Sequence, residues 1–352
     1  MDGEIIMNTI TSMQRVLTTL SFKEPDKVPL FLLFSHYGAK ELKIPIKTYF
    51  SNPNNIVEAQ LKLLKKYRTD CLYGFFYASL ELEAFGGNSI FYDDGPPNAG
   101  PPIINKLSDL DNLGIPPVSE IPCLQNVITA IKYLKKEVND TVPIIGVVMS
   151  PFSLPVMQMG FESYLNLLFL DKTFFNKLMA INEAFCIDWA NAQIEAGATA
   201  ICYFDPVSSP SIITTALYRE TGYLVAKRVL SQIKSAIATH MASGRSLAII
   251  DEIASTGAAV VCVSSNEDLP TLKQKCHNRL SILGNLNGIE MCRWTPENAA
   301  LKVKDAIQKA GKNGGFILSD NHGEIPWYVT EKVLMSISEA TEKWGRYPIK
   351  EF

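Results

Sequence analysis

Eight short apolar runs, each followed by a stretch with helical spacing, fill this 352-residue chain from Val28 to its end. A run such as Val-Pro-Ile-Ile-Gly-Val-Val-Met is apolar at nearly every position, which is typical of parallel strands buried on both faces. Residues 174–196 and 296–310 have helical spacing and good helix formers. Eight alternating units predict an α/β fold, a (β/α)8 barrel. The predicted strands are Val28–Leu33, Asp70–Phe75, Val142–Met149, Ala198–Phe204, Ser235–His240, Ala258–Val263, Leu280–Gly284 and Gly315–Ser319.

An open doubly wound sheet is the alternative fold. That fold usually carries a glycine-rich phosphate loop after its first strand, and this chain has none. We therefore expect one barrel domain over residues 1–352, with residues 1–27 as an extension that contains a predicted helix, Thr9–Leu20. Residues 93–117 are rich in Pro, Gly and Asn, which predicts a long inserted loop with a β-hairpin around Ile90–Tyr92. Such a loop is either functional or a plain surface insertion.

Composition excludes several classes of function. The formal net charge of −3, from 33 basic and 36 acidic residues, gives no electrostatic reason to bind nucleic acid or an anionic membrane. No apolar run is long enough to cross a bilayer, and the N-terminus lacks a signal-peptide pattern. The seven cysteines are scattered and form no Cys-x-x-Cys pair, which indicates isolated thiols in a reducing compartment. We expect a cytoplasmic protein, and we leave open that it forms a homodimer.

Polar and aromatic residues gather at and just after the predicted strands. In a barrel of this type the C-terminal ends of the strands face the active site. Three of the four histidines fall at such ends, and only His277 does not. In strand order, the residues at these positions are His36; Tyr73, Tyr77, Glu81 and Glu83; Ser150 and Pro151; Asp205; His240; Ser264 and Ser265; Asn285 and Asn287; and Asp320, Asn321 and His322.

The candidate catalytic residues are Asp205, His240 and His322. Imidazole and carboxylate groups that converge on one pocket suit Zn²⁺ or a general acid and base. Each residue also has a plain structural interpretation, because an isolated histidine is more often a hydrogen-bonded structural residue and an aspartate before proline often caps a turn. The chain has no short metal motif of the H-E-x-x-H kind. A functional site is therefore favoured by the joint placement of Asp205, His240 and His322 at predicted strand ends.

Seven short segments, in a fixed order along nearly the whole chain, carry a resemblance to a known family. They are Arg15-Val-Leu, Glu24-Pro-Asp-Lys-Val-Pro-Leu, Glu81-Leu-Glu-Ala-Phe-Gly, Ser150-Pro-Phe, Asp205-Pro, Gly284-Asn-Leu-Asn and Gly314-Gly-Phe-Ile-Leu-Ser-Asp-Asn-His-Gly. In these segments the chain resembles the uroporphyrinogen decarboxylase superfamily, and within it the corrinoid-dependent methyltransferases. The resemblance implies a (β/α)8 barrel, in agreement with the strand count.

One departure concerns the decarboxylases of this superfamily. They carry an arginine-rich segment just after the first strand, which holds the carboxylates of the substrate. Here that segment reads Phe31-Leu-Leu-Phe-Ser-His-Tyr-Gly-Ala-Lys, without an arginine. A polycarboxylate porphyrinogen would lack its bidentate partners, so we expect no decarboxylase activity.

A second departure concerns zinc. The family members that methylate thiols bind zinc through a His-x-Cys motif and a distant Cys. By resemblance, the corresponding positions in this chain are His240-Met-Ala and His322. The first methyltransferases of O-demethylase systems instead use two glutamates and a histidine at a characteristic spacing. In this chain Asp205, Glu220 and His240 have nearly that spacing, with gaps of fourteen and nineteen residues. Asp replaces Glu, one gap is a residue shorter, and Glu220 is equally well a solvated helix residue. The resemblance thus implies zinc on Asp205, His240, and Glu220 or His322.

These features predict a zinc-dependent methyltransferase for O-demethylation, which moves a methyl group from a small methyl ether to a corrinoid (cobalamin). We expect the ether to be an aryl methyl ether. Carboxylate and imidazole ligands leave zinc more electrophilic than thiolates do, which favours an oxygen leaving group. The chain has no Asp-x-His-x-x-Gly corrinoid signature, so the Co(I) corrinoid would arrive on a partner protein. The expected substrate-binding residues are His36, Tyr37, Tyr73, Tyr77, Phe152 and Asn285.

Two alternatives stay open at this point. In the first, a methylcorrinoid protein donates its methyl group to a thiol such as coenzyme M, or to tetrahydrofolate. In the second, the barrel is a non-catalytic binding protein that has lost its metal site together with the cysteines.

Overall fold

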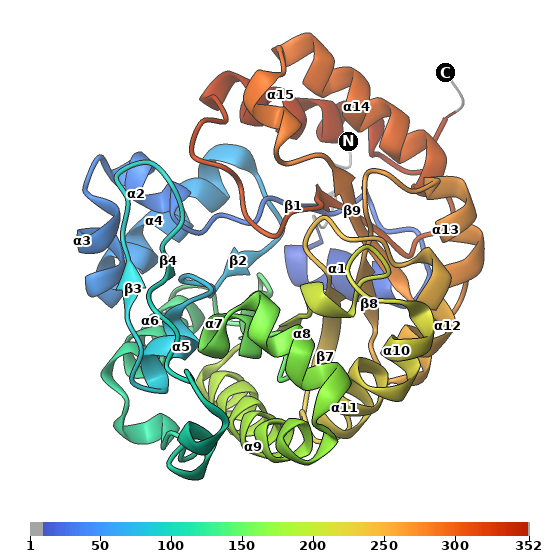
Figure 1. The fold of residues 1–352 in the computed structure, drawn as a ribbon. Helices are drawn as coiled ribbons and strands as arrows, with labels where there is room; N and C mark the ends of the chain where they lie inside the picture. Colours follow the sequence, from blue (N-terminus) through green and yellow to red (C-terminus); the bar gives the residue numbers. More distant parts are fainter. Residues whose placement is uncertain (1–9, 351–352) are drawn as a thin grey trace, which may run out of the picture.

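A parallel sheet of eight strands curls into a barrel at the centre of the computed structural model, which describes residues 10–350 (Figure 1). The strand order is β1-β10-β9-β8-β7-β6-β5-β2, and every pair of neighbours is parallel. The eight predicted strands and the (β/α)8 fold are confirmed. The strands are β1 (Leu30–Phe31), β2 (Leu72–Tyr73), β5 (Ile144–Met149), β6 (Ala200–Phe204), β7 (Ala236–His240), β8 (Val260–Cys262), β9 (Ser281–Leu286) and β10 (Phe316–Asp320).

Helices surround the sheet (Figure 1). None of those in the described part of the chain is long and apolar enough to cross a membrane. The predicted N-terminal helix is confirmed from Ser12 onward, while Thr9 lies outside the described residues. The helices are α1 (Ser12–Leu20), α2 (Tyr37–Leu42), α3 (Ile46–Ser51), α4 (Pro53–Tyr67), α5 (Leu80–Ala84), α6 (Pro122–Val138), α7 (Pro155–Met159), α8 (Phe161–Leu170), α9 (Lys172–Ala196), α10 (Thr215–Glu220), α11 (Gly222–Leu230), α12 (Ile250–Ser255), α13 (Leu269–Cys276), α14 (Pro296–Ala310) and α15 (Glu331–Trp344).

The predicted hairpin is present beside the barrel. It pairs β3 (Ser89–Ile90) with β4 (Asn98–Ala99) in antiparallel fashion. The second strand therefore lies inside the stretch that the sequence predicts as loop. Between the two strands, Asp94 accepts a hydrogen bond from the hydroxyl of Tyr328. The hairpin thus contacts the segment that follows β10.

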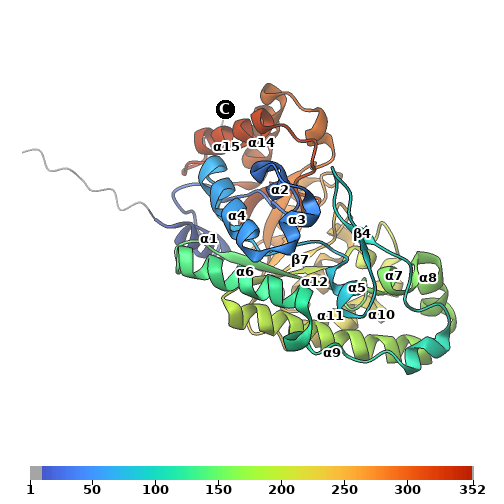
Figure 2. The same cartoon turned by 90° about the vertical axis from the view of Figure 1, so that its left-hand side faces the viewer.

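Side chains alternate between the inside of the barrel and the helix layer. Phe31, Ile145, Cys202, Leu283 and Ile317 pack together inside the barrel, while the residues between them in each strand pack against the helices. Helix α1 covers the N-terminal end of the barrel, and α5, α7 and α8 lie at the opposite end (Figure 2). The strand ends that carry the candidate residues therefore lie on the side away from α1.

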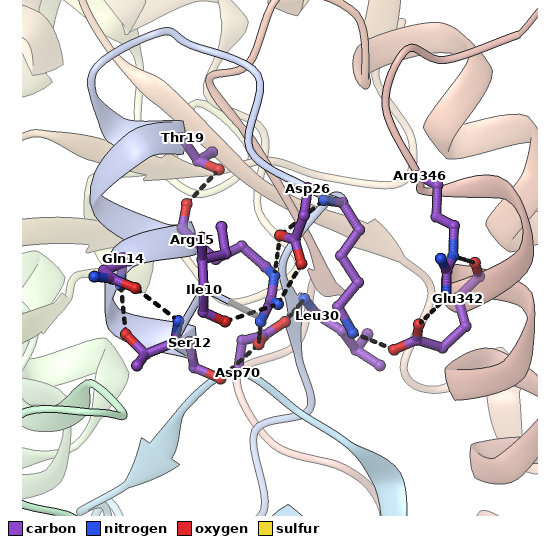
Figure 3. A network of polar contacts seen from close by, with 12 residues as sticks. Ile10, Ser12, Gln14, Arg15, Thr19, Asp26, Leu30, Asp70, Glu342 and Arg346 are labelled. Atoms are coloured by element: carbon purple, nitrogen blue, oxygen red, sulfur yellow. Dashed lines mark hydrogen bonds and ion pairs between the residues drawn. The ribbon is translucent and has the colours of Figure 1, made fainter. Parts of the chain in front are cut away.

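Backbone and side-chain hydrogen bonds close the seam between β1 and β2, which are the two edges of the sheet. The Asp70 N–H donates to the Leu30 carbonyl oxygen at 2.7 Å, and the Asp70 carboxylate accepts from the Leu30 N–H at 3.0 Å. Arg15 of α1 contacts Asp70 Oδ1 at 2.6 Å and both carboxylate oxygens of Asp26 (Figure 3). Because a buried guanidinium is stable only when its charge is paired, this network joins α1 to both edges of the sheet.

Candidate active site

Strand β7 carries His240 to the C-terminal end of the barrel on its inner face. Ala238, two residues earlier, packs against the barrel interior, and alternation places His240 on the same side. The imidazole is fully buried and stacks on Phe204 of β6, with ring centroids 5.0 Å apart. Gly323, which follows β10, lies over the ring, since a Cβ there would be 3.2 Å from His240 Cε1.

The hydrogen bonds of His240 determine which ring nitrogen carries its hydrogen. Burial, reinforced by the nearby His322, lowers the pKa of His240 to about 3, so the ring is neutral at pH 7. Nδ1 accepts the backbone N–H of Ala242 at 3.0 Å. The single hydrogen of the neutral ring is therefore on Nε2. Nε2 is buried and has no hydrogen-bond partner among residues 10–350, so His240 presents an unused N–H donor.

Asp205, at the end of β6, directs its carboxylate away from His240. Phe204 faces the barrel interior, so the next residue faces the helix layer. Asp205 Oδ1 accepts hydrogen bonds from the hydroxyls of Ser150 at 2.5 Å and Ser153 at 2.7 Å. Burial raises the pKa of Asp205, and the serine hydroxyls oppose this rise. The link to β7 runs through the backbone, where the Asp205 N–H donates to the His240 carbonyl oxygen at 2.7 Å.

The structure does not assemble the metal site predicted from Asp205, Glu220, His240 and His322. Glu220 is exposed at the end of α10, beyond the Thr214 cap that starts this helix. His322 is half-buried, close enough to His240 to lower its pKa, and its Nδ1 lies 3.4 Å from Ser243 Oγ. Within residues 10–350, no three His, Cys, Asp or Glu side chains form a group that could hold a metal ion.

The hydrogen bonding of His240 also argues against a metal on this ring. A histidine that binds a metal usually donates its other ring N–H to a carboxylate or carbonyl oxygen. In His240 the other nitrogen accepts a backbone N–H instead, so a metal at Nε2 would have to displace its hydrogen. The residues present therefore do not fit zinc in this arrangement.

A second buried imidazole, His36, follows β1. Its Nδ1 lies 3.0 Å from Glu324 Oε2, and its ring stacks on Trp327. His36 Nε2 is buried and has no partner in the described structure. The sequence predicts His36 as a substrate-binding residue but does not predict Glu324. The two residues are 288 positions apart, and no local sequence pattern indicates that they are in contact.

The other predicted substrate-binding residues make hydrogen bonds or packing contacts within the protein. The hydroxyls of Tyr37, Tyr73 and Tyr77 donate to the Val329 carbonyl, the Gly323 carbonyl and the Glu83 carboxylate, at 3.1, 3.0 and 3.2 Å. Phe152 is fully buried, against Tyr164 and Phe175. Asn285 is half-buried, and its amide donates to the Ser264 carbonyl oxygen at 3.3 Å. Of these residues, Tyr73 touches the segment next to His240.

Glu81 of α5 is a buried carboxyl group that the sequence places after β2. Its Oε1 accepts the Met149 N–H at 2.8 Å, at the end of β5. Burial raises the pKa of Glu81 to about 8, although the Met149 hydrogen bond opposes the rise. The group is therefore mainly protonated at pH 7, and it holds α5 against the strand that leads to Ser150.

Comparisons with known proteins agree with this fold. The family model described as uroporphyrinogen decarboxylase (URO-D) matches residues 11–344. Among curated relatives, the uroporphyrinogen decarboxylase of Actinobacillus pleuropneumoniae serotype 5b is 25% identical, covering 77% of this chain and 78% of the relative. That of Coxiella burnetii (strain RSA 493) is 24% identical, covering 94% and 95%.

Solved structures share the fold at lower identity. A methyltransferase from Methanosarcina mazei superposes with a TM-score of 0.86 at 20% identity, over 95% of this chain and 99% of that chain. A B12-independent methionine synthase from Shewanella sp. W3-18-1 has a TM-score of 0.54 at 11% identity, over 82% and 86%. Because the URO-D family model matches residues 11–344, which is nearly the whole length, the chain belongs to the uroporphyrinogen decarboxylase family.

Proposed function

We propose that this chain is a methyltransferase that takes a methyl group from a small methyl ether and passes it to the corrinoid of a separate protein. The observation that carries the proposal is the neutral imidazole of His240, which presents an unused N–H donor at the C-terminal end of the barrel. A buried donor of this kind suits an oxygen that gains negative charge as its bond to carbon breaks. The likeness in fold to a methyltransferase supports the same reaction class.

The residues after β1 support an ether rather than a polycarboxylate as substrate. The segment from Phe31 to Lys40 contains no arginine. Its one lysine, Lys40, donates to the backbone carbonyl oxygens of Trp327 at 2.5 Å and Val329 at 3.2 Å. This segment therefore offers neither a bidentate cation nor a free ammonium group to bind the carboxylates of a porphyrinogen.

In the proposed reaction, His240 acts on the oxygen of the substrate. The corrinoid of the partner would supply the nucleophile that accepts the methyl group. The electron pair of the broken carbon–oxygen bond stays on the oxygen, and the His240 Nε2–H group donates a hydrogen bond to it. Phe204 stacks on the ring, Gly323 lies close to it, and His240 Nε2 is buried, so we expect this hydrogen bond to form away from water, which strengthens it. Because the residues present do not fit zinc, no step of the proposal runs through a metal.

The decisive experiment mixes the protein with methoxylated aromatic compounds and a reduced corrinoid protein. We expect loss of Co(I) absorbance together with release of the demethylated compound. A parallel reaction with uroporphyrinogen tests the activity named for the curated relatives. Decarboxylation without methyl transfer would refute the proposal, and so would methyl transfer that runs only from a methylcorrinoid to a thiol or tetrahydrofolate.

Zinc stays a prediction from the resemblance, and elemental analysis of the purified protein tests it. One zinc ion per chain that is lost in the His240→Ala variant would show that the side chains rearrange when the metal binds. Absence of zinc from an active protein would agree with the arrangement described above.

A further inference from the structure

Two buried imidazoles contact neighbouring residues of the loop that follows β10. Gly323 packs against the ring of His240, and Glu324 contacts the ring of His36. The loop itself is held in place, because Asp320 Oδ1 accepts the N–H groups of His322 and Gly323, both at 2.8 Å. One short segment therefore fixes both rings at the same end of the barrel.

Both rings have a buried Nε2 atom that bonds to no other atom in the described part of the chain. Buried polar atoms are nearly always hydrogen-bonded, so an unpaired one needs an explanation. A ligand that bonds to these atoms would supply the missing partners. Because both atoms are closed to solvent in the described structure, such a ligand reaches them only when the covering loop moves.

The two rings have opposite hydrogen-bonding character. His240 accepts a backbone N–H at Nδ1, so its Nε2 is a donor. His36 faces a carboxylate at Nδ1, and a carboxylate can only accept, so Nδ1 carries the hydrogen. With Nδ1 as the donor to Glu324, His36 Nε2 is an acceptor whenever the ring carries a single hydrogen.

We propose that the His36–Glu324 pair binds a hydroxyl group of the substrate, which donates its hydrogen bond to His36 Nε2. The site then selects small methyl ethers that also carry a hydroxyl, with the ether oxygen at His240 and the hydroxyl at His36. Glu324 acts as a positioning residue, because it fixes the ring hydrogen of His36 on Nδ1. This assignment rests on the proposed function for the identity of the ligand, but the state of the two rings can be measured without it.

The test reverses the character of His36 with a substitution of equal size. In Glu324→Gln the side-chain amide can donate to Nδ1, which moves the ring hydrogen of His36 to Nε2, as an amide does next to a catalytic histidine in other enzymes. Nitrogen-15 NMR of the full-length protein reports the hydrogen position directly, and the four histidines of the chain make the spectrum assignable. We expect Nδ1–H in the wild type and Nε2–H in the variant.

Binding is measured by calorimetry with the three methoxyphenols and the three dimethoxybenzenes, which differ only in whether the second oxygen carries hydrogen. We expect the wild type to prefer a methoxyphenol over its dimethoxy counterpart by about tenfold. Glu324→Gln should lose this preference. Glu331→Gln, the same change at an exposed ion pair with Lys66, should keep it.

The outcomes separate this inference from the proposed function. Equal preference in the wild type and Glu324→Gln, failure of any methoxyphenol to bind, or an Nε2–H ring in the wild type would overturn the inference. Binding with the expected preference but no methyl transfer to a corrinoid protein would retain the inference and refute the proposed function.

Discussion

Asp205 and His240 end neighbouring strands and share a backbone hydrogen bond of 2.7 Å, yet their side chains lie on opposite sides of the barrel wall. His240 pairs in register with Phe204, so Asp205 is one residue further along and faces the helix layer. The carboxylate accordingly joins Ser150 and Ser153 to the end of β6. Asp205 thus holds the strand ends together, while His240 faces the inside of the barrel at its C-terminal end.

This placement predicts that Asp205 supports stability through its role as an acceptor. Asp205→Ala leaves two buried serine hydroxyls without their acceptor and should lower the free energy of unfolding by about 3 kcal/mol. Asp205→Asn keeps one acceptor oxygen and should lose about 1 kcal/mol. Urea unfolding at pH 7 measures both. Equal stability of the alanine variant and the wild type, or a zinc ion that is lost in Asp205→Asn, would contradict this role.

His240 should contribute to catalysis through its donor hydrogen. His240→Ala removes the donor and should lower kcat for methyl transfer by about 100-fold, the usual cost of removing one preorganised donor. His240→Gln supplies an amide N–H and should recover part of the loss. The disappearance of Co(I) absorbance gives kcat, and the exposed His277→Ala variant serves as the control. Full activity of His240→Ala would remove the main support of the proposed function.

The pKa of His240 also predicts how stability depends on pH. The ring stays neutral in the folded protein down to about pH 3, whereas it is protonated below about pH 6.5 in the unfolded chain. The unfolded state therefore binds more protons between these values, and stability falls as the pH falls through this window, by at most about 1.4 kcal/mol per pH unit. His240→Gln should lack this contribution. Unfolding curves from pH 7 to 5 for both proteins measure the difference, and parallel curves would contradict the assignment.

The sequence was sufficient for the fold because the strands are buried on both faces. Runs such as the one ending at Met149 are apolar throughout, so their position is visible without any tertiary information. The sequence predicts the hairpin but does not indicate its second strand, Asn98–Ala99, because these residues have low strand propensity and pairing with Ser89–Ile90 supplies the structure.

The candidate site was less accessible from the sequence. Strand ends identified His36 and His240, but the direction of Asp205 depends on strand register, which a single sequence does not show. Glu324 contacts His36 from a position 288 residues away. No local pattern predicts such a contact, because the fold alone brings the ends of β1 and β10 together.

Glu81 should make the protein less stable as the pH rises from about 5 to about 8. In the folded state burial raises its pKa from 4.5 to about 8, so the unfolded chain binds fewer protons between these values. Stability therefore falls as the pH rises through this window, by at most about 1.4 kcal/mol per pH unit. Glu81→Gln stays neutral and can still accept the Met149 N–H, so it should match the wild type near pH 5 and exceed it at pH 8. Chemical unfolding at both pH values tests this, and a variant that is no more stable at pH 8 would count against it.

Gly323 should be required for the close cover over His240. Its φ of +103° disfavours other residues, and an added Cβ would lie 2.7 Å from Phe204 Cε2 and 3.2 Å from His240 Cε1. Gly323→Ala should therefore lower both stability and kcat. Gly257→Ala is the matched control, because Gly257 has a φ of +93° and no atom within 4 Å of an added Cβ. Both variants carry similar backbone strain, of about 1 kcal/mol or more, so the additional loss in Gly323→Ala measures the contact with the two rings. If the two variants lose equal stability and Gly323→Ala keeps full kcat, the loop does not hold His240 in its working position.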